Sequence, residues 1–286
     1  MAVAQELVPR RWSHVPIGTN FVGLGYAYTR GDIAFDPVLQ IEETTMDLHT
    51  IGLGYIRTLE LFDKTARVEC KVPYQEAHWE GLLSGQPASA HRSGLADPIV
   101  RVALNLLGGP PLKGKEFAAY RAATDVETTV GLGLATHLPL GQYDETKLLN
   151  LGSNRFTLRP QLGLVHQRGK WTGELTGSVW FFTDNDSFYN GTTREQDPLY
   201  TTQAHLIYTL RPGFWASASG GWGYGGRNTI DGVGKNDKQR NLAWALSLGA
   251  ALTRHFGLQF NYVSIHNRSD IGADTDTVIL GATYFW

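Results

Sequence analysis

The sequence predicts an all-β fold, a transmembrane antiparallel up-and-down β-barrel with 12 strands. Three observations predict it: side-chain character alternates with a period of two, the alternating segments are long, and the connections between them vary between short and long. Composition agrees, because charged residues make up 18% of the chain, below the roughly 25% of soluble domains. A soluble β-sandwich with one oily face is the alternative that these observations disfavour.

The clearest alternation lies in residues 242–252. Leu242, Trp244, Leu246 and Leu248 fall on one face of this segment, and small residues fall on the other. A period of two is typical of a β-strand. We therefore expect the large apolar side chains to face lipid and the small or polar ones to face the inside of the barrel.

The same reading, taken along the chain, gives twelve strands. They span residues 19–31, 44–60, 65–79, 95–107, 124–138, 154–167, 171–183, 198–210, 214–225, 239–253, 256–267 and 275–286. Most are longer than the usual 5 or 6 residues, and a tilted strand needs about 9–11 residues to cross a bilayer. The predicted organisation is an N-terminal periplasmic segment, residues 1–18, followed by the barrel, residues 19–286.

The connections indicate how the barrel is oriented. Short ones follow the second, sixth, eighth and tenth strands, at residues 62–64, 168–170, 211–213 and 254–255, whereas residues 80–94, 139–153 and 184–197 are among the longer loops. Outer-membrane barrels have short periplasmic turns and longer outer loops, so an even number of strands puts both termini in the periplasm. No segment of ten residues has a helical pattern.

The first residues add an expectation about location. Met1 to Gln5 read as a start residue before the tail of a removed secretory signal peptide. With the barrel pattern, this predicts a mature protein of the bacterial outer membrane. Residues 1–18 either hang in the periplasm or fold into the barrel mouth, and we expect loose contact because free termini are usually mobile.

Aromatic residues gather toward the strand ends, as in the aromatic girdles at membrane interfaces. The predicted interface residues are Tyr26, Tyr28, Trp171, Phe181, Trp222, Tyr224, Tyr284 and Trp286. The partners that follow are membrane lipid and lipopolysaccharide around the barrel and small-molecule solutes inside it, and we expect a monomer.

Alternation also selects the residues that face inward. The predicted pore-lining set is Arg67, Glu69, Lys71, Arg101, Asn105, Asp125, Glu127, Arg159, Gln161, Glu174, Gln203 and His205. Charged rings steer solutes in membrane channels, and twelve strands fall between filled eight-stranded barrels and open 16-stranded porins. A narrow water-filled passage follows, and the open alternative is that these side chains pair and seal the lumen.

Other classes of function find little support in the sequence. A net charge of -2 and a pI near 6.5 give no electrostatic footprint for nucleic acid. The nine histidines lack metal-ligand spacing, and no cofactor motif is present, because Gly221 to Gly226 satisfy phosphate-loop spacing without a following helix. The single cysteine, Cys70, excludes an internal disulfide and is expected to face lipid.

The C-terminus and a set of internal motifs each resemble known families. Residues 281–286, Gly-Ala-Thr-Tyr-Phe-Trp, resemble the C-terminal signal of outer-membrane barrels, which implies recognition by the assembly machinery through Trp286. Ser93 to Pro98, the Gly-Leu-Gly centres at 23–25, 52–54 and 131–133, and Leu138 to Gly141 resemble the phenol-degradation MetA-pathway family of outer-membrane transporters. That resemblance implies passive uptake of small molecules, including apolar or aromatic compounds, and no chemical step.

Two competing functions are kept. His91 and Ser93 lie two residues apart, as in an outer-membrane phospholipase, and a serine nucleophile needs a base within hydrogen-bond reach. The other alternative is a sealed barrel with a purely structural role.

Overall fold

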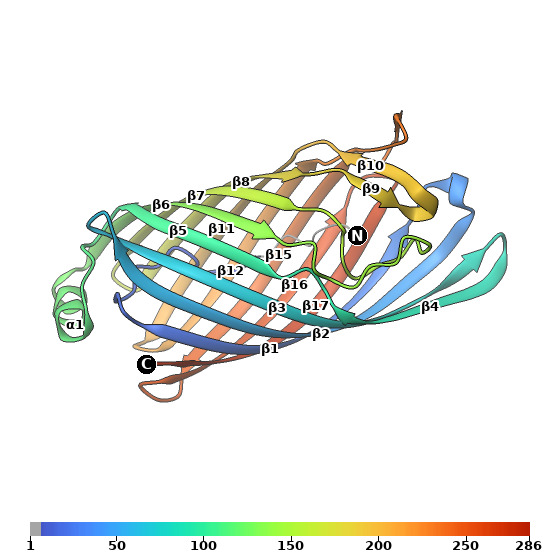
Figure 1. Ribbon diagram of the computed structural model, residues 1–286. Helices are drawn as coiled ribbons and strands as arrows, with labels where there is room; N and C mark the ends of the chain where they lie inside the picture. The colour runs from blue at the N-terminus through green and yellow to red at the C-terminus, as the bar shows by residue number, and fades with distance from the viewer. Residues whose placement is uncertain (1–6) are drawn as a thin grey trace.

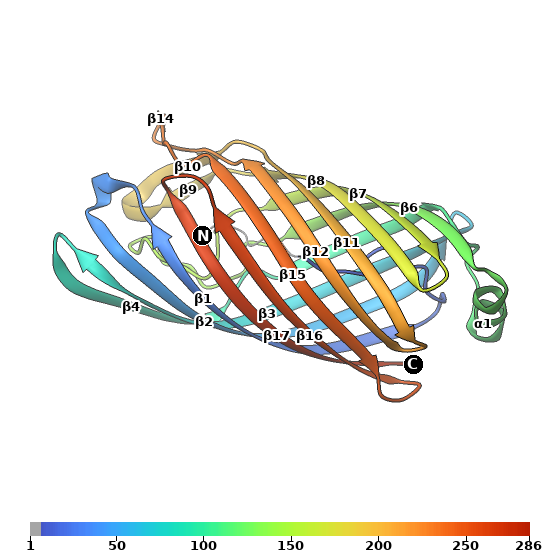
Figure 2. The ribbon, with the colours of Figure 1, turned by 180° about the vertical axis from the view of Figure 1, so that it is seen from behind.

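The computed structural model describes residues 7–286 and shows an elongated barrel of tilted strands (Figures 1 and 2). The strands of the wall are β1 (Asn20–Ala34), β2 (Ile41–Leu61), β3 (Lys64–Leu83), β4 (Gln86–Leu95), β5 (Ile99–Leu107), β6 (Val126–His137), β7 (Thr157–Arg168), β8 (Trp171–Phe182), β11 (Leu199–Arg211), β12 (Phe214–Gly225), β15 (Gln239–Ala251), β16 (Phe256–Asn267) and β17 (Gly272–Phe285).

Hydrogen bonding closes this sheet on itself. The order is β2, β1, β17, β16, β15, β12, β11, β8, β7, β6, β5, β3 and β4, and an additional pairing joins β2 to β3. All of these pairings are antiparallel, and β1 pairs with both β2 and the last strand, β17. Closure removes the free edges that a lipid environment would leave without hydrogen bonds.

Strands β4 and β5 share one place in the wall, which makes the barrel twelve-stranded. The turn-proximal part of β3 pairs with β5 from Ala66 to Lys71, and its far part pairs with β4 from Tyr74 to Leu83. Residues 96–98 separate the two strands, and Pro98 has no N–H to continue the ladder. Beyond this break, β2, β3 and β4 form a three-stranded extension that projects from the barrel (Figure 1).

The two ends of the barrel differ. The end with the short connections, here called the turn end, carries the C-terminus and the helix α1 (Gly114–Ala123). The opposite end, the loop end, carries the extension and the short elements η1 (Pro37–Leu39), β9 (Asn185–Phe188), η2 (Tyr189–Gly191), β10 (Thr192–Gln196), β13 (Asn228–Ile230) and β14 (Val233–Gly234). Within residues 7–286, no helix is long and apolar enough to span a membrane.

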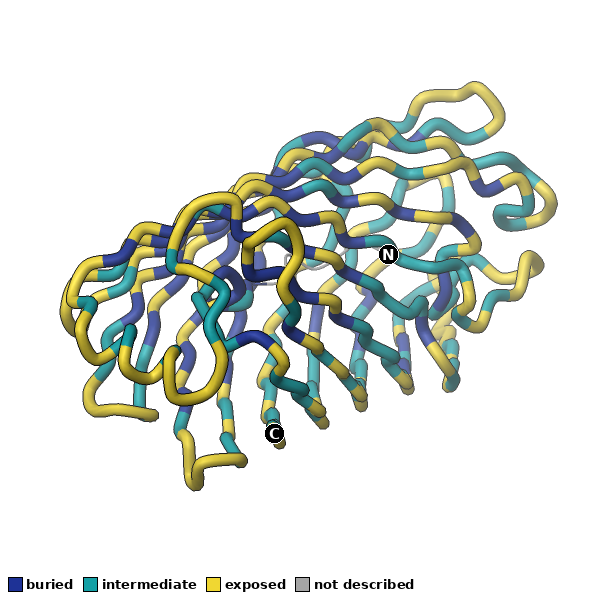
Figure 3. Tube along the Cα trace, turned by 60° about the vertical axis from the view of Figure 1, so that its left-hand side comes forward, coloured by how far each residue is buried: buried dark blue, intermediate teal, exposed yellow. Residues whose placement is uncertain are grey.

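The pattern of burial is the reverse of that in a soluble protein, because apolar side chains lie outside and polar side chains lie inside. Outward side chains such as Leu24, Leu162 and Leu280 are more than half exposed, at 57%, 56% and 55%, whereas inward polar residues such as Arg159 and Gln161 are buried. Figure 3 shows the resulting alternation of buried and exposed residues along the strands. Large exposed apolar surfaces mark contact with a partner or membrane, and here the apolar surface surrounds the barrel.

The twelve predicted strands correspond to the twelve positions in the wall, which confirms the fold class. Two local predictions are wrong. Residues 80–94, expected to be a loop, form the ends of the β3–β4 hairpin, and residues 114–123, where no helix was expected, form α1. The predicted signal-peptide remnant, Met1 to Gln5, lies outside the described residues.

Candidate functional site

Residues 7–18, here called the plug, lie inside the barrel. Leu7, Trp12 and Ile17 are almost completely buried, with exposed fractions of 4%, 1% and 6%. A segment outside the barrel would leave these side chains in water. Residues 7–18 therefore follow the alternative in which the N-terminal segment folds into the barrel, because their apolar side chains pack against the inner wall.

Trp12 is fitted against glycines of the wall. A Cβ atom at Gly163 would come within 2.2 Å of the indole ring, and one at Gly131 within 2.3 Å. The indole Nε1 donates a hydrogen bond of 2.9 Å to the hydroxyl of Thr176. Glycine is therefore required at these inward positions of β6 and β7, because any larger residue would collide with Trp12.

Further contacts hold the plug on both sides of Trp12. Arg67 donates hydrogen bonds to the carbonyl oxygens of Arg11 and Ser13, at 2.8 and 2.6 Å. The Arg10 guanidinium lies 5.4 Å from the centre of the Trp215 ring, across the lumen on β12. Leu7 packs into an apolar cluster that is formed by Ala243, Ala245, Val263 and Ile265.

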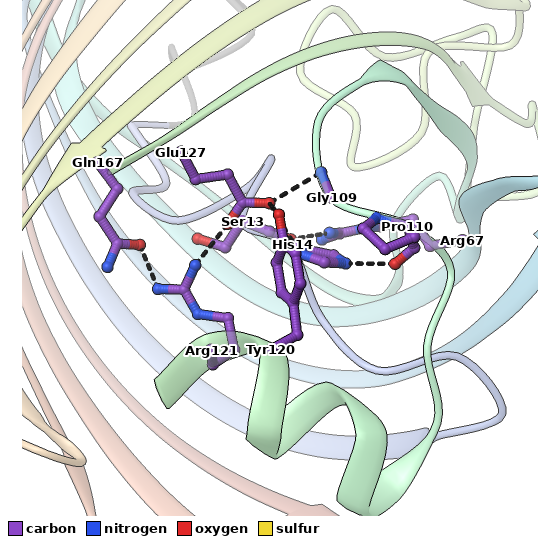
Figure 4. A network of polar contacts seen from close by, with 9 residues as sticks. All are labelled: Ser13, His14, Arg67, Gly109, Pro110, Tyr120, Arg121, Glu127 and Gln167. Carbon is purple, nitrogen blue, oxygen red and sulfur yellow. Dashed lines mark hydrogen bonds and ion pairs between the residues drawn. The ribbon is translucent and has the colours of Figure 1, made fainter. Parts of the chain in front are cut away.

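At the turn end, His14 joins the plug to the connection that contains α1 (Figure 4). Its Nδ1 lies 2.9 Å from Oε1 of Glu127, and its Nε2 lies 3.0 Å from the carbonyl oxygen of Pro110. Arg121 of α1 contacts the same carboxylate at 2.5 Å and donates a second hydrogen bond of 2.6 Å to Gln167. The α1 connection therefore fixes the plug where it leaves the barrel.

Beside Trp12, polar side chains of β3, β5 and β7 meet in the lumen. Arg101 contacts Glu69 at 2.5 Å, donates to Gln161 at 2.7 Å, and lies 4.6 Å from the Trp12 ring centre. Arg159 stacks 4.2 Å from the Trp180 ring centre and donates to Ser178. A cavity of about 10 Å³, room for about one water molecule, is lined by Arg11, Glu69, Lys71, Arg101, His137 and Arg159.

Most of the predicted pore-lining residues lie on the inner face. The buried ones are Arg67, Glu69, Arg101, Asn105, Glu127, Arg159, Gln161, Glu174, Gln203 and His205. Lys71 is partly buried beside them. Asp125 differs, because β6 begins one residue after it and leaves its side chain exposed in the connection at the turn end.

The predicted interface aromatics lie on the outer face. Tyr26, Trp171, Phe181, Trp222, Tyr284 and Trp286 are exposed, and Tyr28 and Tyr224 are half-buried. Trp222 stacks on Tyr224 with ring centres 5.8 Å apart. Cys70, expected to face lipid, is partly exposed on β3.

His91 and Ser93 lie on β4, in the projecting extension, instead of in a loop. The imidazole Nε2 of His91 lies 3.1 Å from Oε1 of Glu76, but no hydrogen bond joins His91 to Ser93 among the contacts of residues 7–286. Both side chains are exposed on the outer hairpin. No group of three or more His, Cys, Asp or Glu side chains is arranged for a metal ion in that same part of the chain.

The sequence did not reveal that Trp12 packs against Gly131 and Gly163 of the wall. The segment had no strand pattern, and its Pro9, Arg10, Arg11, Trp12 and Pro16 were compatible with either alternative. A tryptophan beside two arginines in an otherwise irregular terminus was the available signal. The glycines of the wall gave no separate indication that an indole ring would cover them.

A closed barrel with an apolar outer face, a polar inner face and a chain segment inside its lumen is the architecture of a bacterial outer-membrane β-barrel protein. Among solved structures, the chain is similar to an outer membrane channel from Pseudomonas putida F1, with a TM-score of 0.80 and 21% identity over 98% of this chain and 100% of that chain. It is also similar to the transport unit of the autotransporter AIDA-I from Escherichia coli, with a TM-score of 0.55 and 11% identity over 98% and 94% of the two chains.

The translocator domain of the autotransporter NalP from Neisseria meningitidis is similar at a TM-score of 0.53 and 13% identity, over 96% of this chain and 90% of that one. Residues 17–270 match the family described as "Putative MetA-pathway of phenol degradation", and the chain belongs to this family. This match confirms the resemblance to the phenol-degradation MetA-pathway family that the sequence motifs indicated. No curated protein sequence matches the chain.

Proposed function

We propose that the protein is a passive channel for small molecules in the outer membrane, with a lumen that the plug closes in the present conformation. The fit of Trp12 against Gly131 and Gly163 carries this proposal. A barrel with only a structural role could fill its lumen with side chains of the wall, as small barrels do. The plug is instead a separate chain segment that rests against wall glycines, so it can move out of the lumen and open a passage.

Small aromatic compounds are the proposed cargo. The family description refers to phenol degradation, and the lumen contains two tryptophans, Trp180 and Trp215, each with a guanidinium group stacked over its ring. Aromatic rings pack favourably against other rings. The arrangement thus suits a solute with one flat apolar part and one polar part.

We also propose that the turn end faces the periplasm. The short connections lie at this end, and so do the start of the first strand, β1, and the end of the last strand, β17, which supports that orientation. The plug then enters the lumen from the periplasmic side. The exposed Trp286 at the same end is the proposed contact of the assembly machinery, and the apolar outer face is the proposed contact of lipid and lipopolysaccharide.

The test is single-channel recording in planar bilayers with the Trp12→Ala variant. Truncating a buried tryptophan costs about 3 kcal/mol or more, which corresponds to roughly a hundredfold shift between the plugged and unplugged forms. We expect rare, small openings of the wild type and frequent, larger openings of the variant. Trp171→Ala, which truncates an exposed tryptophan on the outer face, is the matched control and should behave as wild type.

A sealed barrel would give no discrete conductance steps in any of the three proteins. That result, obtained with protein shown to be folded by its heat-dependent electrophoretic mobility, would overturn the channel proposal.

A further inference from the structure

Two arginines, Arg155 and Arg194, lie close together at the loop end. Arg155 precedes β7 and is buried, with an exposed fraction of 6%, and Arg194 is half-buried on β10. Neither forms an ion pair with any of residues 7–286, although each lies within electrostatic reach of the other. A buried charge is costly unless it is paired, so this arrangement calls for a negatively charged partner.

The hydrogen-bond partners of the two guanidinium groups are neutral, whereas the carboxylates of Asp97 and Asp184 act on Arg155, and that of Asp237 acts on Arg194, only at a distance. Nη2 of Arg155 donates to the side-chain oxygen of Gln196, and Nε of Arg194 donates to that of Asn228 at 2.7 Å. Nη1 of Arg155 is buried and has no hydrogen-bond partner among residues 7–286. Burial lowers the pKa of Arg155 to about 9, and the positive charge of Arg194 acts in the same direction.

An aromatic ring supports each guanidinium. The Arg155 guanidinium lies 4.6 Å from the ring centre of Phe182, and that of Arg194 lies 5.3 Å from the ring centre of Phe188. Stacking holds the planar groups in place and leaves their edges for hydrogen bonds. The edge of a guanidinium matches a carboxylate, which it can bind through two parallel N–H bonds.

We propose that Arg155 and Arg194 form a binding site for the carboxylate of a small organic acid at the entrance of the lumen, with Phe182 and Phe188 favouring an aromatic acid. This deepens the proposed function, on which it rests, by naming the chemical class of a solute. The site lies at the start of a path of arginines. Arg159 lies on β7, the strand that begins two residues after Arg155, and Arg101 lies next to Arg159 and over the Trp12 ring.

The test is calorimetric titration of the full-length protein in detergent micelles with benzoate as the probe. We expect saturable binding of benzoate, at least tenfold weaker binding by Arg155→Gln and by Arg194→Gln, and an intermediate loss for Arg155→Lys, because lysine keeps the charge but not the two-bond geometry. Arg211→Gln is the matched control. Arg211 also stacks on a ring, that of Phe214, but is exposed at the turn end.

Three further probes distinguish the sources of binding. Acetate should bind more weakly than benzoate if the rings contribute, and equal affinity for inorganic phosphate would show a general anion site and overturn the carboxylate assignment. The affinity for phenol, which has no carboxylate, should not change in either glutamine variant. Benzoate binding that is absent, or unchanged in the two glutamine variants, overturns the inference. Because titration needs no conductance, this result is independent of the bilayer test of the channel.

Discussion

Two parts of the barrel wall present different inward side chains to the plug. Strands β3, β5, β6, β7 and β8, the charged wall, point charged side chains inward: Arg67, Glu69, Lys71, Arg101, Glu127, Arg159 and Glu174. Strands β12, β15, β16, β17 and β1, the small-residue wall, present mostly serine, glycine, alanine and asparagine, such as Ser217, Ser247, Gly25 and Asn261.

The charged wall gives hydrogen bonds and an ion pair to the middle of the plug. Trp12 is bonded to β8, Ser13 to β3 and His14 to β6, whereas the small-residue wall gives the packing of Leu7 and the stacking of Arg10 on Trp215. Small side chains leave more space than arginines do. We therefore expect a passage, once opened, to follow the small-residue wall while the charged wall selects the solute.

The largest expected effect comes from replacing a glycine of the charged wall. Gly163→Ala places a Cβ atom 2.2 Å from the indole ring of Trp12, so the plug must move, and conductance in planar bilayers should rise several-fold. Gly25→Ala on the small-residue wall is the control, because its nearest neighbour would be 3.8 Å away. Equal conductance of the two variants would show that the walls do not differ in how they hold the plug.

A smaller effect is expected from removing charge on the charged wall. With the plug loosened by Trp12→Ala, the pair Arg101→Gln and Arg159→Gln should shift the reversal potential in a salt gradient toward cation preference, because inward charges set ion selectivity. The pair Ser217→Ala and Ser247→Ala on the opposite wall should leave it unchanged. A reversal potential that does not move after the arginine substitutions would show that these two residues do not line the conducting path.

The smallest effect concerns one hydroxyl on each wall. Thr176→Val removes the hydrogen-bond acceptor of Trp12 and should lower the free energy of unfolding by about 1 kcal/mol. Ser247→Ala removes a buried hydroxyl that has no hydrogen-bond partner in the described part of the chain, so stability should be unchanged or slightly higher. Denaturant unfolding in micelles measures both values, and a larger loss for Ser247→Ala would contradict the comparison.

The barrel wall was predictable because its physics is local. Facing lipid and facing the lumen impose a period of two, which residues 242–252 show in sequence and β15 shows in structure. The β3–β4 extension was not recognised, since its Ser, Gly and Pro residues are typical of loops. Helix α1 was missed because it has no apolar stripe and buries none of its residues.

The lumen was predictable only in part. Alternation identified the inward charges, but it says nothing about which of them meet. The bond between Trp12 and Thr176 joins residues 164 positions apart, and the two arginines at the loop end come from different connections. Such contacts depend on how the closed wall brings distant segments together.

The seam between β1 and β17 keeps the plug beside its binding place. The plug directly precedes β1, and β1 pairs along its length with the last strand from Phe21 to Ala34. Because this pairing fixes the start of β1 in the closed wall, a plug that leaves the glycines of β6 and β7 stays tethered at the turn end. The tether keeps the effective concentration of the plug at the lumen high, so release and return are unimolecular steps, and the barrel can close again without a partner molecule.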